Sequence, residues 1–296
     1  MLPQVLEQWK ASIATGDMFD MEFPLRGADC IFRPFLTRVL PLKDAAGNIL
    51  QWFGTNTDII ERKRVEQETM MEFLNLLNKS KGAVDLLHSA VNFFHDRSGL
   101  EAKGIRLKDG NDYPYFEKSG FPKEFMRLEN SIFVRNDFGQ SICDSDGYPI
   151  HECMCGNVIC GRFDSSKPFF TARGSLWINC TTELLATTIE DDRQAHTCNR
   201  CNGEGYESVV LIALRVGDDR LGLLQLNDKR KGQFTLETIS MWERLADYLA
   251  IALAKTQSEE SLQKAHENLQ MKSRSCRLSL KRSRNKTKSC KLSQSS

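Results

Sequence analysis

The stretch ESVVLIALRVGDDRLGLLQLND, residues 207–228, decides the fold of the larger part of this chain. Two mainly apolar runs flank Gly217-Asp218-Asp219, and glycine next to aspartate is typical of a tight turn between antiparallel strands. The following segment, residues 234–256, has the apolar spacing of an amphipathic helix. We expect Thr235 to cap this helix and Glu237 to lie in its first turn, where a carboxylate interacts favourably with the helix dipole.

The segments upstream of this hairpin indicate the same fold class. AKGIRL, residues 102–107, reads as a strand that ends in a turn, and PYFEKSGFP follows it. A long irregular insert that carries most of the cysteines separates these segments from the hairpin. We therefore expect an α+β domain over residues 84–255, with an antiparallel sheet flanked by helices.

These segments resemble a GAF domain. The resemblance is carried by LGLLQLND, GQFT and LADYLAIALA, and by the cysteine-rich phrases ECMCGNVICGRFD (residues 152–164) and NRCNGEGYESV (residues 199–209). It extends to a subfamily found in bacterial and archaeal sensor kinases. It implies a regulatory module that binds a small molecule or senses redox state, is usually dimeric, and is coupled to its output through helices. The resemblance does not imply a particular ligand.

The first 64 residues predict a separate and smaller sheet. Residues 19–29, 31–49 and 50–64 read as three strands, and Phe32, Pro34 and Leu36 alternate with more polar positions in the second. One short helix before them, residues 2–14, cannot cover both faces of such a sheet. The segment resembles the C-terminal half of a PAS domain with its PAC motif, above all in GTNTDIIERKR. The first strands and pocket helices of that family would precede Met1, so the resemblance implies dimerisation or signal relay.

Helices are expected to join and follow these two parts. Residues 65–83 have apolar positions spaced for a helical, coiled-coil linker, with a break near Ser80. A polar helix over residues 256–270 resembles the helix that joins such domains to a kinase. Residues 271–296 hold nine of the 40 lysine and arginine residues and none of the 39 acidic residues. We expect this basic tail to be disordered, and we interpret it as an out-of-frame or truncated end.

The ten cysteines allow several kinds of site. Cys198 and Cys201 have the two-residue spacing of a zinc knuckle, and Cys153 and Cys155 would supply a second pair of ligands. Thiolates at such spacing suit zinc or an iron–sulfur cluster. The cofactor is therefore unknown at this point, with zinc or haem as named candidates.

The haem hypothesis rests on the family resemblance. Some GAF domains of archaeal redox-sensing kinases hold haem through a cysteine tether and a histidine ligand, so His196 would be the ligand and Cys153 or Cys155 the tether. Reversible disulfide formation between neighbouring thiols is a third hypothesis. A fourth is that the cysteines are small core side chains, which we expect of Cys160 and Cys180 because their neighbours are apolar.

Several functional classes are disfavoured by the sequence. It has no apolar run long enough to span a bilayer and no secretory signal, so cytoplasmic thiols are expected. Walker, Rossmann, nucleophile-elbow, kinase and cyclase motifs are absent, which argues against an enzyme. The basic tail would attract phosphates only without sequence preference, which argues against a nucleic-acid partner. The sequence predicts a cytoplasmic sensor, a homodimer through its flanking helices, that acts in a histidine kinase or response-regulator pathway. The alternatives are a dimerisation scaffold that senses nothing, or a remnant of a sensor kinase.

Overall fold

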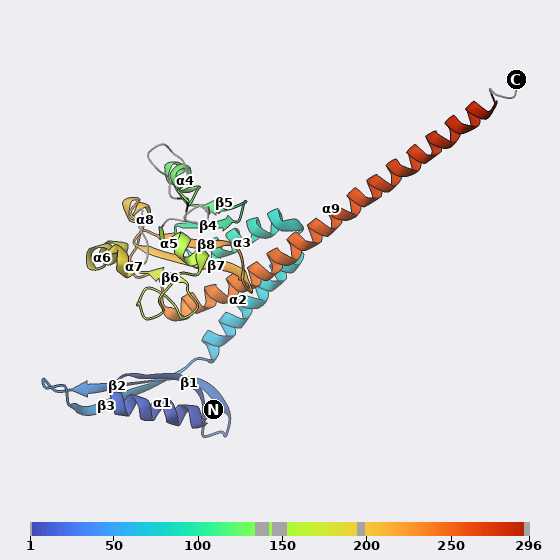
Figure 1. The fold of residues 1–296 in the computed structure, drawn as a ribbon. Helices are drawn as coiled ribbons and strands as arrows, with labels where there is room; N and C mark the ends of the chain where they lie inside the picture. Colours follow the sequence, from blue (N-terminus) through green and yellow to red (C-terminus); the bar gives the residue numbers. More distant parts are fainter. Residues whose placement is uncertain (1, 134–141, 144–152, 194–198, 293–296) are drawn as a thin grey trace. The chain divides into compact units, whose positions relative to one another are not determined.

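The computed structural model describes residues 2–133, 142–143, 153–193 and 199–292 (Figure 1). The chain divides into two compact units, Met1–Glu72 and Phe73–Ser296. Within the described residues the first unit has a three-stranded antiparallel sheet and the second a five-stranded one. The α+β class with antiparallel sheets and helices is therefore confirmed, while the exact domain boundaries given above stay predictions.

The first unit is a helix packed on one face of its sheet. Trp9 packs edge-on against Phe19 and Trp52, with ring centroids 5.4 and 5.5 Å apart. The three strands expected from the sequence are confirmed. The elements, with strand order β1-β2-β3, are α1 (Leu2–Thr15), β1 (Phe19–Arg26), β2 (Phe32–Lys43) and β3 (Ile49–Asp58).

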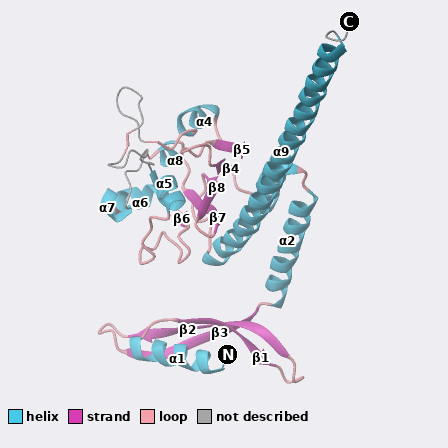
Figure 2. Cartoon of the chain, turned by 45° about the vertical axis from the view of Figure 1, so that its right-hand side comes forward, coloured by secondary structure: helices cyan, strands magenta, loops and turns pink. Residues whose placement is uncertain are grey.

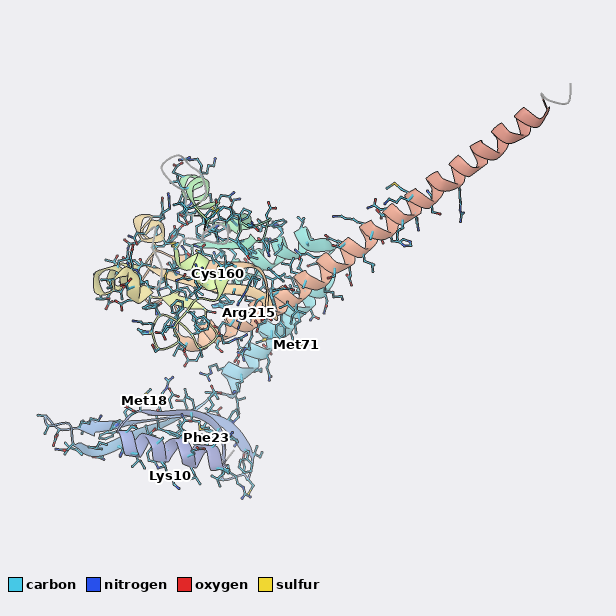
Figure 3. The ribbon with its side chains drawn as sticks, in the orientation of Figure 1. Lys10, Met18, Phe23, Met71, Cys160 and Arg215 are labelled. Carbon is cyan, nitrogen blue, oxygen red and sulfur yellow. The ribbon has the colours of Figure 1, made fainter. Side chains whose placement is uncertain are left out.

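The second face of this sheet is exposed within the unit. Leu40 lies opposite Phe53 across β2 and β3, and the two residues are 54% and 55% exposed. Lys10 is exposed on α1, and Phe23 is half-buried on β1 (Figure 3). The expectation that one short helix leaves a face uncovered is thus confirmed, whereas the likeness to half of a PAS domain stays a prediction.

Two helices lead from the first sheet to the second. They are α2 (Ile60–Lys79) and α3 (Gly82–Ser98), so the helix breaks at Ser80 as the sequence predicts. Gly82 has a φ of +83°, a conformation that glycine adopts without strain. Buried Phe73 of α2 contacts Phe93 and Phe94 of α3, with centroids 4.7 and 5.5 Å apart.

The second unit is built on the hairpin that the sequence identifies. Its strand order is β5-β4-β8-β7-β6, and every neighbouring pair is antiparallel. The expected strand AKGIRL and both hairpin strands are confirmed. The strands are β4 (Ala102–Leu107), β5 (Tyr115–Ser119), β6 (Leu176–Ile178), β7 (Ser208–Val216) and β8 (Asp219–Asp228).

Helices cover both faces of this five-stranded sheet (Figure 2). α3 and α9 (Leu236–Leu292) pack on one face, where Phe94 contacts Trp242 at 5.6 Å. α5 (Cys153–Cys160) packs on the other face and joins a core with Val209, Leu211 and Leu223. The remaining helices are α4 (Lys123–Glu129), α6 (Thr181–Thr187), α7 (Glu190–Arg193) and α8 (Arg200–Gly203).

The last helix begins as predicted but continues further than predicted. The hydroxyl of Thr235 accepts a hydrogen bond from the Thr238 amide at 3.2 Å, and Glu237 lies in the first turn. Residues 271–292, which we expected to be disordered, continue α9. This segment contains no proline or glycine, and lysine, arginine and leucine are good helix formers. In the part of the chain that is described, no helix is both long and apolar enough to cross a membrane.

Candidate functional site

Three cysteines from two helices line one cavity beside the five-stranded sheet. Cys153 and Cys155 come from α5, and Cys201 comes from α8. The cavity has a volume of about 60 Å³, which is room for a few water molecules. We call it the cysteine pocket. Its other lining residues are mainly apolar and include Leu176, Ile178, Leu184, Val209 and Leu211.

The backbone is unusual where two of the lining residues lie. Cys153 has a φ of 64° and Asn199 has a φ of 53°. Asparagine tolerates this left-handed conformation, whereas cysteine rarely adopts it, and such strain is concentrated at functional sites. Cys155, in contrast, is 5% exposed on a regular helix. The fold thus holds one thiol in a buried position and presents another from a strained turn.

A fully buried arginine lies on the same side of the sheet. Arg106 of β4 has no exposed surface, and its guanidinium carbon lies 3.7 Å from the ring centroid of Tyr115. Its terminal nitrogens donate to the carbonyls of Tyr113 at 3.1 Å and Glu129 at 2.6 Å. Its Nε has no hydrogen-bond partner among the described residues. Arg106 therefore brings a positive charge into an interior that would otherwise favour neutral groups.

A chain of hydrogen bonds connects this arginine and tyrosine pair to a thiol. The Tyr115 hydroxyl donates to Gln225 Oε1 at 2.6 Å. Gln225 Nε2 lies 3.8 Å and Asn227 Nδ2 lies 3.6 Å from Cys201 Sγ, so two amide groups donate to one sulfur. Hydrogen bonds to a sulfur favour its negative form, because donors stabilise the thiolate more than the thiol.

These groups also interact electrostatically. Burial raises the pKa of Tyr115 well above its ordinary value, the Arg106 charge opposes this, and Cys155 and Cys201 raise it further. Burial lowers the pKa of Arg106, but Tyr115, Cys155 and Glu129 more than offset this, so its pKa is raised. Arg106 therefore stays charged, and it favours negative charge at the nearby cysteines.

A larger cavity adjoins the cysteine pocket. It has a volume of about 360 Å³, is lined by residues 127–133, and shares Cys153, Cys155 and Arg200 with the smaller cavity. Arg200 Nε lies 2.7 Å from a Glu129 carboxylate oxygen. The other oxygen of that carboxylate lies 4.0 Å from Arg106. Glu129 thus bridges two arginines at the border between the cavities.

The residues expected to form the site are only partly within the described chain. Cys153, Cys155 and Cys201 lie together, whereas His196 and Cys198 fall outside the described residues. Among the described residues no group of three or more histidine, cysteine, aspartate or glutamate side chains has the geometry to hold a metal ion. The zinc, iron–sulfur and haem hypotheses stay predictions. A haem needs a pocket of several hundred Å³, and the larger cavity approaches this size.

Two other cysteines are more exposed than the sequence predicts. Cys160 is exposed and Cys180 is half-buried, so the expectation that both are core residues is wrong. The Cys180 sulfur accepts a hydrogen bond from the Glu183 amide at 3.4 Å and caps α6. The polar residues Gln225 and Asn227 were missed as site residues, although polar side chains at alternate positions of the otherwise apolar β8 were a signal.

Comparison with known proteins gives short or distant likenesses. No family model matches the sequence. A stretch of 67 residues, 23% of this chain, is 40% identical to the peroxide stress-activated histidine kinase mak1 of Schizosaccharomyces pombe, and it covers 4% of that protein. This chain therefore spans a small fraction of the length of the kinase that it matches.

Two solved structures illustrate the likeness in three dimensions. The GAF domain of the phosphoenolpyruvate-protein phosphotransferase from Acinetobacter is 14% identical, with a TM-score of 0.44 over 66% of this chain and 95% of that chain. Free methionine-R-sulfoxide reductase from Neisseria meningitidis, in complex with its substrate, is 11% identical, with a TM-score of 0.45 over 67% and 93%. Scores below 0.5 do not establish a common fold.

Proposed function

We propose that the chain is a sensory signalling module of the GAF type, that the cysteine pocket is its input site, and that oxidation of Cys201 is the signal. The observation that carries this proposal is the pair of amide donors, from Gln225 and Asn227, on the Cys201 sulfur. Cys155, with the Arg106 charge nearby, lines the same cavity and is the second thiol. Thiols with such neighbours are the reactive ones in proteins.

A hydroperoxide is the oxidant that we propose. The Cys201 thiolate attacks the distal peroxide oxygen, the O–O bond breaks, and the alcohol or water leaves with a proton, so that a sulfenic acid forms. The sulfur of Cys155 or Cys153 then attacks the sulfenic sulfur, the S–O bond breaks and water leaves. Two thiols are oxidised to one disulfide, and one peroxide is reduced. The likeness of a short stretch to a kinase named for activation by peroxide stress supports this choice of oxidant.

The two faces of β8 offer a route for the signal. Side chains alternate along a strand, so Gln225 and Asn227 face the cysteine pocket while Leu224 and Leu226 face α3 and α9. Both leucines are fully buried. A disulfide at Cys201 would remove the sulfur that Gln225 and Asn227 contact, and the strand would have to adjust against the helices. We propose that α9 passes this change to a histidine kinase pathway in a reducing, cytoplasmic compartment, through a helix-mediated homodimer.

The test uses the full chain, purified with reductant and then treated with hydrogen peroxide or cumene hydroperoxide. Peptide mapping without reductant is expected to recover a disulfide between Cys201 and Cys155 or Cys153, which dithiothreitol reverses. Cys201→Ser should abolish this crosslink, and Cys180→Ser, which alters a thiol outside the pocket, should leave it intact. If Cys201 stays a thiol under conditions that oxidise exposed Cys160, the redox proposal is wrong.

The same reduced sample separates the competing site hypotheses. Bound zinc at one equivalent per chain, lost in Cys201→Ser, would replace redox sensing by a structural metal site. An absorption band near 400 nm that is retained after acid extraction and altered in His196→Ala would identify a tethered haem. Neither finding is expected if the three thiols form the redox site described above.

A further inference from the structure

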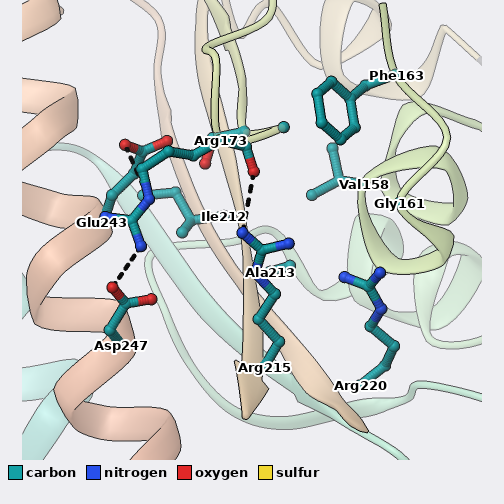
Figure 4. Close-up of a pocket in the computed structure, with 12 residues that line it drawn as sticks. Val158, Gly161, Phe163, Arg173, Ile212, Ala213, Arg215, Arg220, Glu243 and Asp247 are labelled. Atoms are coloured by element: carbon teal, nitrogen blue, oxygen red, sulfur yellow. Dashed lines mark hydrogen bonds and ion pairs between the residues drawn. The ribbon is translucent and has the colours of Figure 1, made fainter. Parts of the chain in front are cut away.

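A second pocket, separate from the cysteine pocket, lies near the turn of the β7–β8 hairpin. It is lined by three arginines, from the loop before β6 (Arg173), from β7 (Arg215) and from β8 (Arg220), and by Glu243 and Asp247 of α9 (Figure 4). Its volume is about 20 Å³, and it opens to solvent. At this level of the sheet β6 has ended, so side chains rather than a neighbouring strand lie along the outer edge of β7.

Two of these arginines form a like-charged pair. Arg215 is the direct cross-strand partner of Arg220 in the β7–β8 ladder. Side chains in such positions project from the same face with Cβ atoms about 5 Å apart, and like charges placed there destabilise the sheet. A negative charge close by would offset this repulsion.

The described residues do not supply that charge. Among the described residues no carboxylate lies within ion-pair distance of Arg215 or Arg220. Arg215 donates one hydrogen bond, to the carbonyl of Arg173 at 3.4 Å. No hydrogen bond from Arg220 to a described residue is found. Both guanidinium groups project into the same pocket (Figure 4).

The two carboxylates of the pocket already have a partner. Arg173 contacts Asp247 through one terminal nitrogen, and its Nε lies 3.9 Å from Glu243. Glu243 also accepts a hydrogen bond from the Thr171 hydroxyl at 2.7 Å. Asp219 is next to Arg220, but successive side chains of a strand point to opposite faces. The charges of Arg215 and Arg220 are therefore available to interact with a bound anion.

The backbone leaves room for the Arg220 guanidinium. Gly161, at the end of α5, has a φ of +70°, and a Cβ atom there would lie 2.7 Å from Arg220 Nη2. Any other residue at this position would push the guanidinium away from the pocket. A glycine thus suits both the left-handed backbone and the approach of the arginine.

We propose that this pocket binds the phosphate group of a small molecule between Arg215 and Arg220. Guanidinium groups match tetrahedral oxyanions with paired N–H donors, and a dianion offsets both charges where a carboxylate offsets one. The proposal does not depend on the redox function, because neither arginine lines the cysteine pocket.

The probe is inorganic phosphate, added to the full chain at constant ionic strength with sodium chloride as balance. At a phosphate concentration ten times the dissociation constant, the unfolding temperature is expected to rise by about 3–6 °C. Arg215→Gln and Arg220→Gln should each weaken binding at least tenfold, whereas Lys231→Gln, with the same loss of charge outside the pocket, should leave it unchanged. Without phosphate, Arg220→Gln should unfold at the same or a higher temperature than the wild type, because the like-charged pair is gone.

Several results would overturn the proposal. Equal stabilisation of the wild type and both glutamine variants would mean a general salt effect. Equal stabilisation by acetate would mean a carboxylate site rather than a phosphate site. Should a glutamine variant fail to fold, calorimetric titration of phosphate into the wild type and Arg220→Lys remains informative, because weaker but measurable binding is expected for the lysine variant. No heat of binding in the wild type would also refute the site.

Discussion

Replacing Arg106 by methionine tests whether this buried guanidinium holds the candidate site together. The change leaves the buried carbonyls of Tyr113 and Glu129 without their donor and removes the stack on Tyr115 at 3.7 Å. A buried acceptor that loses its donor costs about 1–3 kcal/mol, so the two carbonyls together cost about 2–6 kcal/mol. For a unit of this size each kcal/mol shifts the unfolding temperature by about 2–4 °C. We therefore expect Arg106→Met to lower that temperature by about 4–24 °C.

Circular dichroism during heating measures the effect, and two further variants interpret it. Arg127→Met removes an exposed arginine that pairs with Glu124 on the same helix, and it should not shift the transition measurably. Arg106→Lys keeps the charge but lacks the two terminal nitrogens that reach separate carbonyls, so an intermediate shift is expected. The reasoning fails if Arg106→Met unfolds within 2 °C or so of the wild type.

Two further changes probe the sheet around the site. Gly222→Ala would place a Cβ atom 2.0 Å from the Arg106 carbonyl oxygen, so it should cost about 1–3 kcal/mol or more in chemical denaturation, whereas Gly203→Ala meets no atom within 4 Å and should change little. Hydrogen bonds from Arg230 hold the pKa of Asp228 below its ordinary value, so this carboxylate stabilises the fold above that value, and its contribution is lost as pH falls through the lowered pKa. Asp228→Asn should lower the unfolding temperature at pH 7, and its difference from the wild type should shrink below about pH 4; a difference that persists at pH 2 would contradict this.

The secondary structure of the hairpin region could be predicted because local signals agree there. The Gly217-Asp218 turn, the apolar strands and the Thr235 cap each act within a few residues, and each is found where expected. The short helix α5 could not be predicted in the same way. Only eight residues long, it is held by packing on Val209 and Leu223 from distant strands, and no sequence window contains those contacts.

The burial of two charged residues in β4 also could not be predicted from the sequence. Lys103 and Arg106 have no exposed surface, although charged residues in a strand normally indicate a solvent face. Their partners come from elsewhere in the chain: Lys103 Nζ lies 2.7 Å from His95 Nδ1 of α3, and Arg106 binds carbonyls at the end of α4. Correct prediction of the strand therefore gave no indication that Arg106 belongs to the site.

The position of Cys201 relative to β8 connects the cysteine pocket to the helices on the other face of the sheet. A thiol in a loop could be oxidised without consequence for the fold. Cys201 Sγ instead accepts hydrogen bonds from Gln225 and Asn227, whose backbone pairs with both β4 and β7 in the middle of the sheet. Since the interior is close-packed, a displacement of β8 on one face has to be accommodated by Leu224 and Leu226 on the other. The residues that contact the thiol are thus next in sequence to residues that pack against α3 and α9, which is the shortest path that a strand can provide.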